Sequence, residues 1–217
     1  MSAYIILRGS PYPGRLNDME TRMRTVMGVM AQKGAINSRL FRNLMGADAG
    51  DMGIGFEFEN FHQALSAFHE ARQDPMLMEV NRKRWEDPAG DISGPVLMRD
   101  VYKPMDITAP VVVVRTYQMS RKHLPEMIGI VKEIDSLSDN QVTAMVPVQH
   151  PQMDRIHGIY HFHSLADAGK YIDEVGLSTR FQELAQLALE HHPARGLRDG
   201  DRGPRPGKRA VGFEEVE

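Results

Sequence analysis

The sequence contains no cysteine, and this absence removes several kinds of chemistry at once. Disulfides, thiolate metal sites and cysteine nucleophiles are excluded, so histidine and carboxylate side chains remain as the strong candidate ligands. A chain without cysteine suits a reducing compartment, and we expect a cytoplasmic protein.

Long apolar runs and a strong net charge are missing as well. No stretch approaches the roughly 20 apolar residues that span a bilayer, and the first residues lack the pattern of a signal peptide. The net charge of −3 gives no basic field, so neither nucleic acid nor a membrane is an expected partner. No Gly-rich phosphate loop, nucleophile elbow or HExxH motif occurs. The expected partner is a small organic substrate, bound by a monomer or homodimer.

What the sequence does contain is an internal repeat. The segment "YIILRGS" from residue 4 returns as "VVVVRTY" from residue 111, with Arg115 in the place of Arg8. The segment "GIGFEFENF" from residue 53 returns as "HGIYHFHSL" from residue 157, and the residues that follow keep the same offset. Each half therefore predicts the order strand, helix, strand, strand, helix, strand.

The helices of the repeat show apolar stripes at steps of three and four. The stripes of the first helix in each half are formed by Leu16, Met19, Met23, Val26, Met27 and Met30, and by Leu124, Met127, Ile128, Val131 and Ile134. Asn60 with Gln63, and Ser164 with Asp167, predict the start of the second helix in each half, because these pairs have capping-box spacing. A further short helix is expected from Asp74-Pro75 and from Ser178.

This order predicts an α+β fold with two ferredoxin-like repeats (βαββαβ twice) that form an intrachain α+β barrel. The expected domains are a first repeat over 1–103, a linker over 104–109 and a second repeat over 110–217. Residues 191–208 are rich in Gly, Pro and charge, so a mobile loop is expected there.

The duplicated strands, the element order and the segment "RQDPMLMEVNRKRW" make the chain resemble the dimeric α+β-barrel superfamily. That superfamily includes antibiotic-biosynthesis monooxygenases, polyketide cyclases, muconolactone isomerases, and EthD-like and NIPSNAP-like proteins, with haem enzymes among its longer tandem members. The resemblance implies a ligand inside the barrel, between sheet and helices, handled by His, Tyr, Asn, Trp or Arg.

Alternation along the duplicated third strand assigns side chains to faces. Phe56 and Phe58 are expected under the helices, with Tyr160 and Phe162 in the second half. The residues on the other face of these strands are expected to face the barrel interior, since an unpaired carboxylate buried under a helix would cost several kcal/mol. These inward residues are Glu57, Glu59, His157, Ile159, His161 and His163.

Three interpretations of this polar set remain open. In the first, His161 or His163 moves a proton of a bound aromatic or carboxylated substrate, with Glu57 or Glu59 orienting it, in a lyase, isomerase, cyclase or cofactor-free oxygenase. The expected substrate-binding residues are Arg8, Arg115, His157 and Tyr117. Arg8 and Arg115 are placed near Glu59 and His163 on the expectation that the first and third strands are parallel neighbours.

In the second interpretation, His161 and His163, completed by Glu57, bind iron, zinc or haem in an oxidoreductase. In the third, the charged groups only neutralise one another in a non-catalytic ligand-binding or stress protein. The leading hypothesis uses no cofactor.

Overall fold

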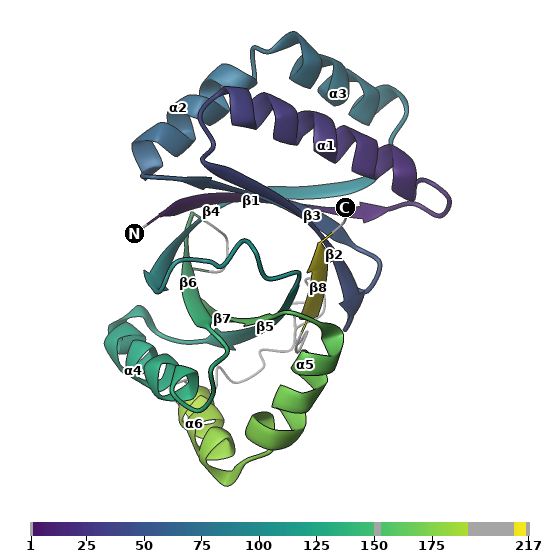
Figure 1. Cartoon of the computed structure of the whole chain (residues 1–217). Coiled ribbons are helices and arrows are strands. Elements are labelled where there is room, and N and C mark those ends of the chain that lie inside the picture. Colours follow the sequence, from purple (N-terminus) through teal and green to yellow (C-terminus); the bar gives the residue numbers. More distant parts are fainter. Residues whose placement is uncertain (1, 150–152, 191–210, 216–217) are drawn as a thin grey trace, which may run out of the picture.

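The computed structural model describes residues 2–149, 153–190 and 211–215. The predicted loop 191–208 lies outside these residues. Figure 1 shows a β-barrel between two layers of helices, with α1–α3 over one side and α4–α6 over the other. The fold is α+β with tandem ferredoxin-like repeats, as the sequence predicts.

The two halves of the chain have matching element orders. The first half consists of β1 (Ala3–Pro11), α1 (Leu16–Gln32), β2 (Asn37–Met45), β3 (Met52–Phe58), α2 (Phe61–Ala71), α3 (Pro75–Glu86) and β4 (Gly90–Tyr102). The second half consists of β5 (Val111–Gln118), η1 (Arg121–His123), α4 (Leu124–Asp135), β6 (Val142–Gln149), β7 (Arg155–Phe162), α5 (Leu165–Tyr171), η2 (Ile172–Gly176), α6 (Thr179–Glu190) and β8 (Val211–Glu215).

The strands form a closed barrel in the order β1-β3-β2-β8-β5-β7-β6-β4. The two halves join where β4 pairs with β6 and where β2 pairs with β8. The expectation that the first and third strands run parallel is wrong, because β1 and β3 are antiparallel. The β2–β3 hairpin reverses the chain after α1 has returned it, so β3 runs against β1.

Side-chain caps start the second helix of each half as the sequence predicts. The Asn60 side chain accepts a hydrogen bond from the Gln63 amide, and Ser164 accepts one from the Asp167 amide. The third helix of the first half begins after Asp74, whose side chain caps the Met76 amide. Each cap satisfies a backbone donor that the first helical turn leaves without a partner.

The apolar side chains form three separate cores. One lies between β1–β4 and α1–α3, a second lies between β5–β7 and α4–α6, and a third fills the barrel. Phe56 and Phe58 belong to the first core, and Tyr160 and Phe162 belong to the second, so the helix-facing side of both third strands is confirmed.

The segment between β4 and β5 crosses one end of the barrel (Figure 1). The Pro104 carbonyl accepts hydrogen bonds from Gln141 Nε2 at 2.7 Å and Thr143 Oγ1 at 2.9 Å, and Met105 packs against the barrel core. Arg39 of β2 donates to the Ala109 carbonyl. We retain 104–109 as the linker, and we call this end of the barrel the floor. None of the helices described is long and apolar enough to cross a membrane.

Candidate functional site

His161 lies on the barrel floor, where it is 3% exposed. Its Nε2 is 3.0 Å from Thr143 Oγ1. Because the single Thr143 hydroxyl proton is donated to Pro104, the threonine oxygen accepts from a protonated Nε2. The Nδ1 atom has no side-chain hydrogen-bond partner among the described residues, and the backbone of Asp106 interacts with the ring.

The floor keeps His161 neutral. Burial lowers the pKa of its imidazole from 6.5 to about 4, because a buried charge loses its hydration. Asp106 on the linker opposes this shift in pKa, and Arg39 of β2 adds to it. His161 is therefore a neutral imidazole at pH 7.

Glu57 also faces the barrel, at the same end. Its carboxylate accepts hydrogen bonds from Ser2 Oγ at 2.7 Å, Asn37 Nδ2 at 2.9 Å and the Tyr4 hydroxyl at 3.4 Å. Burial, reinforced by the charge of Glu57, raises the pKa of Tyr4 to about 12. The inward direction of Glu57 and His161 is thus as the alternation predicts.

Glu59 and His163 do not belong to this group, which corrects their predicted position. β3 ends at Phe58 and β7 ends at Phe162, so the alternation no longer applies to the next residue. Glu59 is exposed and accepts a hydrogen bond from Gln63 of α2 at 3.2 Å. His163 is exposed just before the α5 cap.

Arg8 and Arg115 do not come near Glu59 and His163, and they lie on opposite faces of the barrel wall. The pairs Tyr4↔Glu57 and Val112↔His161 show that Val112 corresponds to Tyr4, so the residue that corresponds to Arg8 is Thr116. A one-residue shift of register moves a side chain to the other face of a strand.

Arg115 consequently lies under the helices. Its guanidinium carbon is 4.5 Å from the Phe181 ring centroid and 5.5 Å from that of Tyr160. Tyr117 packs against the same core. Arg8 and His157, the other two predicted substrate-binding residues, both line the barrel interior at the end opposite the floor.

The metal interpretation finds no support in this geometry. Among the residues the structure describes, no three His, Asp or Glu side chains lie close enough to hold a metal ion. His161, His163 and Glu57 are therefore not brought together as ligands for iron or zinc.

The innermost part of the barrel, below the end opposite the floor, leaves little space for an aromatic substrate. A void of about 70 Å³ remains among side chains that include Met98, Met105 and Met145. This is about half the volume of a cavity of roughly 150 Å³ that binds benzene. The predicted location of the ligand inside the barrel is thus not favoured.

A larger cavity of about 260 Å³ lies between the helices and the sheet of the first half. Methionines of α1, Phe56 of β3, Phe68 of α2 and Leu77 of α3 form most of its apolar wall. We call it the helix–sheet cavity. Its polar lining consists of Arg22, Arg72, Asn81 and Arg84.

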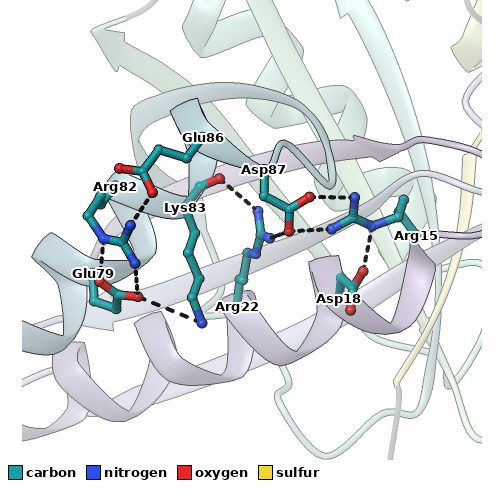
Figure 2. A network of polar contacts seen from close by, with 8 residues as sticks. All are labelled: Arg15, Asp18, Arg22, Glu79, Arg82, Lys83, Glu86 and Asp87. Carbon is teal, nitrogen blue, oxygen red and sulfur yellow. Dashed lines mark hydrogen bonds and ion pairs between the residues drawn. The ribbon is translucent and has the colours of Figure 1, made fainter.

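Of these arginines, Arg22 is engaged in an ion-pair network between α1 and α3. Figure 2 shows that Arg15 and Arg22 both point to the carboxylate of Asp87, with nitrogen–oxygen distances of 2.7 Å and 3.0 Å. Arg22 also donates to the Lys83 carbonyl at 3.4 Å. The network holds α3 against α1 beside the cavity.

Arg84 and Arg72 are less constrained. Arg84 donates a long hydrogen bond of 3.3 Å to the Ile92 carbonyl, and its guanidinium lies 5.8 Å from the centroid of the exposed Trp85 ring. Arg72 makes no hydrogen bond or ion pair through its side chain with any other described residue. The helix–sheet cavity is therefore a mainly apolar pocket, and the exposed Arg72 in its lining has no bonded partner among the described residues.

No residue pattern in the sequence indicates this cavity, although the family resemblance implies a ligand between sheet and helices. The α1 methionines are predicted only as part of an apolar helical stripe. The one usable signal is that Arg22 occurs one position before Met23 of the buried stripe.

Comparison with known proteins identifies solved structures with the same fold. No protein-family model matches the sequence, and no curated protein matches it. Solved structures resemble it over almost the whole chain, and at their low identities they show the fold alone.

One such structure, an anthrone oxidase-like protein, has a TM-score of 0.67 at 8% identity, and the match covers 100% of this chain and 91% of that one. A monooxygenase-like protein from Listeria innocua has a TM-score of 0.55 at 9% identity, covering 100% and 95%. The haem-degrading enzyme of Listeria monocytogenes has a TM-score of 0.53 at 10% identity, covering 99% of each chain. The chain has the tandem ferredoxin-like fold of these proteins.

Within the part of the chain that the structure describes, haem does not fit the residues of either helix–sheet layer. The lining of the helix–sheet cavity includes no histidine that could bind the iron. The corresponding space of the second half is filled by the rings of Tyr160, Phe162, Tyr171 and Phe181.

Proposed function

We propose that this protein binds a flat, apolar molecule with an anionic oxygen in the helix–sheet cavity and oxidises it with molecular oxygen. The observation that carries the proposal is the guanidinium of Arg72, which is exposed at the edge of a mainly apolar cavity and has no bonded partner among the described residues. The reaction class is that of a cofactor-free monooxygenase.

The size of the cavity supports a ligand with two or three fused rings. Its volume of about 260 Å³ exceeds the roughly 150 Å³ that holds benzene. The apolar walls favour a ring system over a sugar or nucleotide, because they offer few hydrogen bonds to buried hydroxyl groups.

The charge of the lining supports an anionic oxygen on that ligand. Arg72 and Arg84 are cations near the apolar wall, and no Asp or Glu is part of the lining. A carboxylate, phenolate or enolate placed there gains charge-assisted hydrogen bonds. The same cations lower the pKa of a bound phenol or enol, which favours ionisation without a protein base.

Oxygenase chemistry agrees with this lining better than lyase or isomerase chemistry does. An ionised, electron-rich ring can itself reduce O₂, and conversion of a ring methylene to a carbonyl balances as CH₂ + O₂ → C=O + H₂O. The substrate supplies all four electrons. The anthrone oxidase-like and monooxygenase-like structures of the same fold are consistent with this assignment.

Binding of 1-hydroxy-2-naphthoate, measured by isothermal titration calorimetry, tests the site. We expect Arg72→Met to weaken binding about tenfold or more, and Val80→Trp to weaken it by filling the cavity from its rim. Arg24→Met is the control, because Arg24 is a helical arginine outside the lining. Unchanged affinity in Arg72→Met would contradict the role of the charge, and unchanged affinity in Val80→Trp would contradict the location.

Oxygen consumption with anthrone, followed with an oxygen electrode, tests the reaction separately. We expect consumption of one O₂ per anthrone and loss of turnover in Val80→Trp. The role of His161 as a catalytic base stays a prediction, and the turnover of His161→Gln tests it. If the wild-type protein binds the naphthoate and anthrone but consumes no oxygen, the binding assignment stands and the oxygenase assignment fails.

A further inference from the structure

A second hollow lies at the end of the barrel opposite the floor, and we call it the barrel mouth. It has a volume of about 470 Å³. Ile6, Arg8, Met98 and His157 line both the mouth and the 70 Å³ void inside the barrel, so the two spaces adjoin. The mouth lies on the inner face of β1, whereas the helix–sheet cavity lies on its outer face.

Two guanidinium groups face this mouth from opposite walls. Arg8 comes from β1 and Arg155 from β7, and these strands are not neighbours in the barrel. Arg8 is surrounded by the barrel wall and still exposes its side chain, because the mouth is hollow. Each half of the chain thus contributes one arginine to one hollow.

The two charges are not neutralised by bonds within the described part of the chain. Neither Arg8 nor Arg155 makes an ion pair or a side-chain hydrogen bond with another described residue. Burial lowers the pKa of Arg8; the more distant charges of Asp48 and Asp51 oppose this, and the positive charge of Arg155 adds to it. Two like charges held across one hollow favour an anion between them.

The remaining lining defines what else the anion carries. Gln149 and Ser93 supply polar groups, and His157 is held by the Thr116 hydroxyl, 2.9 Å from its Nδ1. Below them, the inner void is lined mainly by Val, Ile and Met. Its 70 Å³ accommodates about two groups the size of a water molecule or methylene, at roughly 30 Å³ each.

We propose that the barrel mouth is a binding site for a small oxyanion, a carboxylate or phosphate, with a short aliphatic tail that enters the inner void. Arg8 and Arg155 bind the oxyanion from the two halves of the chain. This site and the helix–sheet cavity share only Gly94 and Pro95 in their linings, and the binding proposed here does not depend on the function proposed for that cavity.

Isothermal titration calorimetry of the full chain with butyrate and with inorganic phosphate tests the proposal and separates the two sources of the oxyanion. We expect the wild type to bind at least one of them with a Kd below about 1 mM in low-chloride buffer. Arg8→Met and Arg155→Met should each weaken that binding about tenfold or more. Arg42→Met is the matched control, because Arg42 is a strand arginine on the outer face of the barrel wall and outside the mouth.

The variants must first show the wild-type far-UV circular dichroism spectrum, and we expect them to, since each removes one of two repelling charges. Tighter binding of butyrate than of phosphate would assign the inner void to an aliphatic tail, whereas binding of phosphate alone would support the oxyanion and remove the tail. Absence of binding by the wild type, or equal loss in Arg42→Met and Arg8→Met, would overturn the site. Naphthoate binding by Arg8→Met should stay at the wild-type level, so failure here is distinguishable from failure at the helix–sheet cavity.

Discussion

The buried imidazole of His161 gives a sharp prediction about stability and pH. His161→Gln should remove part of the acid sensitivity of the fold, because the folded protein resists protonation of this ring. The pKa in the folded protein is about 4, below the ordinary value of 6.5 that applies to the unfolded chain. Between these values the unfolded chain binds the proton and the folded chain does not, so stability falls as the pH falls.

The size of the effect follows from the two pKa values. Relative to neutral pH, protonation of the unfolded chain alone lowers the free energy of unfolding by roughly 2 kcal/mol at pH 5 and roughly 3 kcal/mol at pH 4. The contribution of His161 is fully present above pH 6.5 and is lost as the pH falls through 4. Because the His161 ring is only 3% exposed, the full difference between its two pKa values contributes to stability.

Urea unfolding of the wild type and of His161→Gln at pH 7, 5 and 4 measures this contribution. The difference between the two proteins should shift by roughly 2 kcal/mol in favour of the variant between pH 7 and pH 5. His163→Gln is the control, since it removes an exposed imidazole two residues further along the chain. Parallel pH profiles for the wild type and His161→Gln would show that this ring is not held neutral inside the barrel.

Two further substitutions test the packing of the barrel and of the second half. Gly53→Ala should lower the free energy of unfolding by about 1–3 kcal/mol in urea titrations, because the new Cβ would lie 2.3 Å from the Phe41 ring and 2.9 Å from the Leu7 carbonyl oxygen. Wild-type stability would mean that Phe41 moves freely. Asp135→Ala should cost about 2 kcal/mol at pH 7, because Asp135 accepts hydrogen bonds from the Val142 amide at 2.7 Å and the Tyr102 hydroxyl at 2.8 Å. Burial alone would raise the pKa of Asp135, but hydrogen bonds from Lys103, Val142 and Tyr102 lower it. The stabilisation should therefore disappear as the pH falls below 3.8. The stability of the wild type should then approach that of the variant.

Much of the fold could be predicted from the sequence, because the repeated helices and strands have strong local signals such as helix caps and alternating side chains. The capped second helices begin at Asn60 and Ser164, and the alternating third strands place Phe56 and Tyr160 under helices. These features depend on residues close together in the chain. They can therefore be predicted without knowing which strands pair.

The candidate site depended on register and strand ends, which the sequence pattern does not specify. Matching Arg115 to Arg8 was wrong by one residue, and one residue exchanges the inside of a barrel for the outside. Glu59 and His163 were assigned by alternation beyond the ends of their strands. The helix–sheet cavity was missed for a different reason, since a void is a shortfall in the volume of many side chains and leaves no motif.

The smaller side-chain volume under the helices of the first half is seen when equivalent positions of the two repeats are compared. Ala67 of α2 occupies the place that Tyr171 of α5 takes in the second half, and Leu77 of α3 occupies the place of Phe181 of α6. The Tyr171 and Phe181 rings, with centroids 6.4 Å apart, fill the space under the second helical layer, and Arg115 covers Phe181. The first half has no counterpart to these rings, and its space stays open. Among the described residues, the second half thus packs the Tyr171 and Phe181 rings where the first half has the helix–sheet cavity.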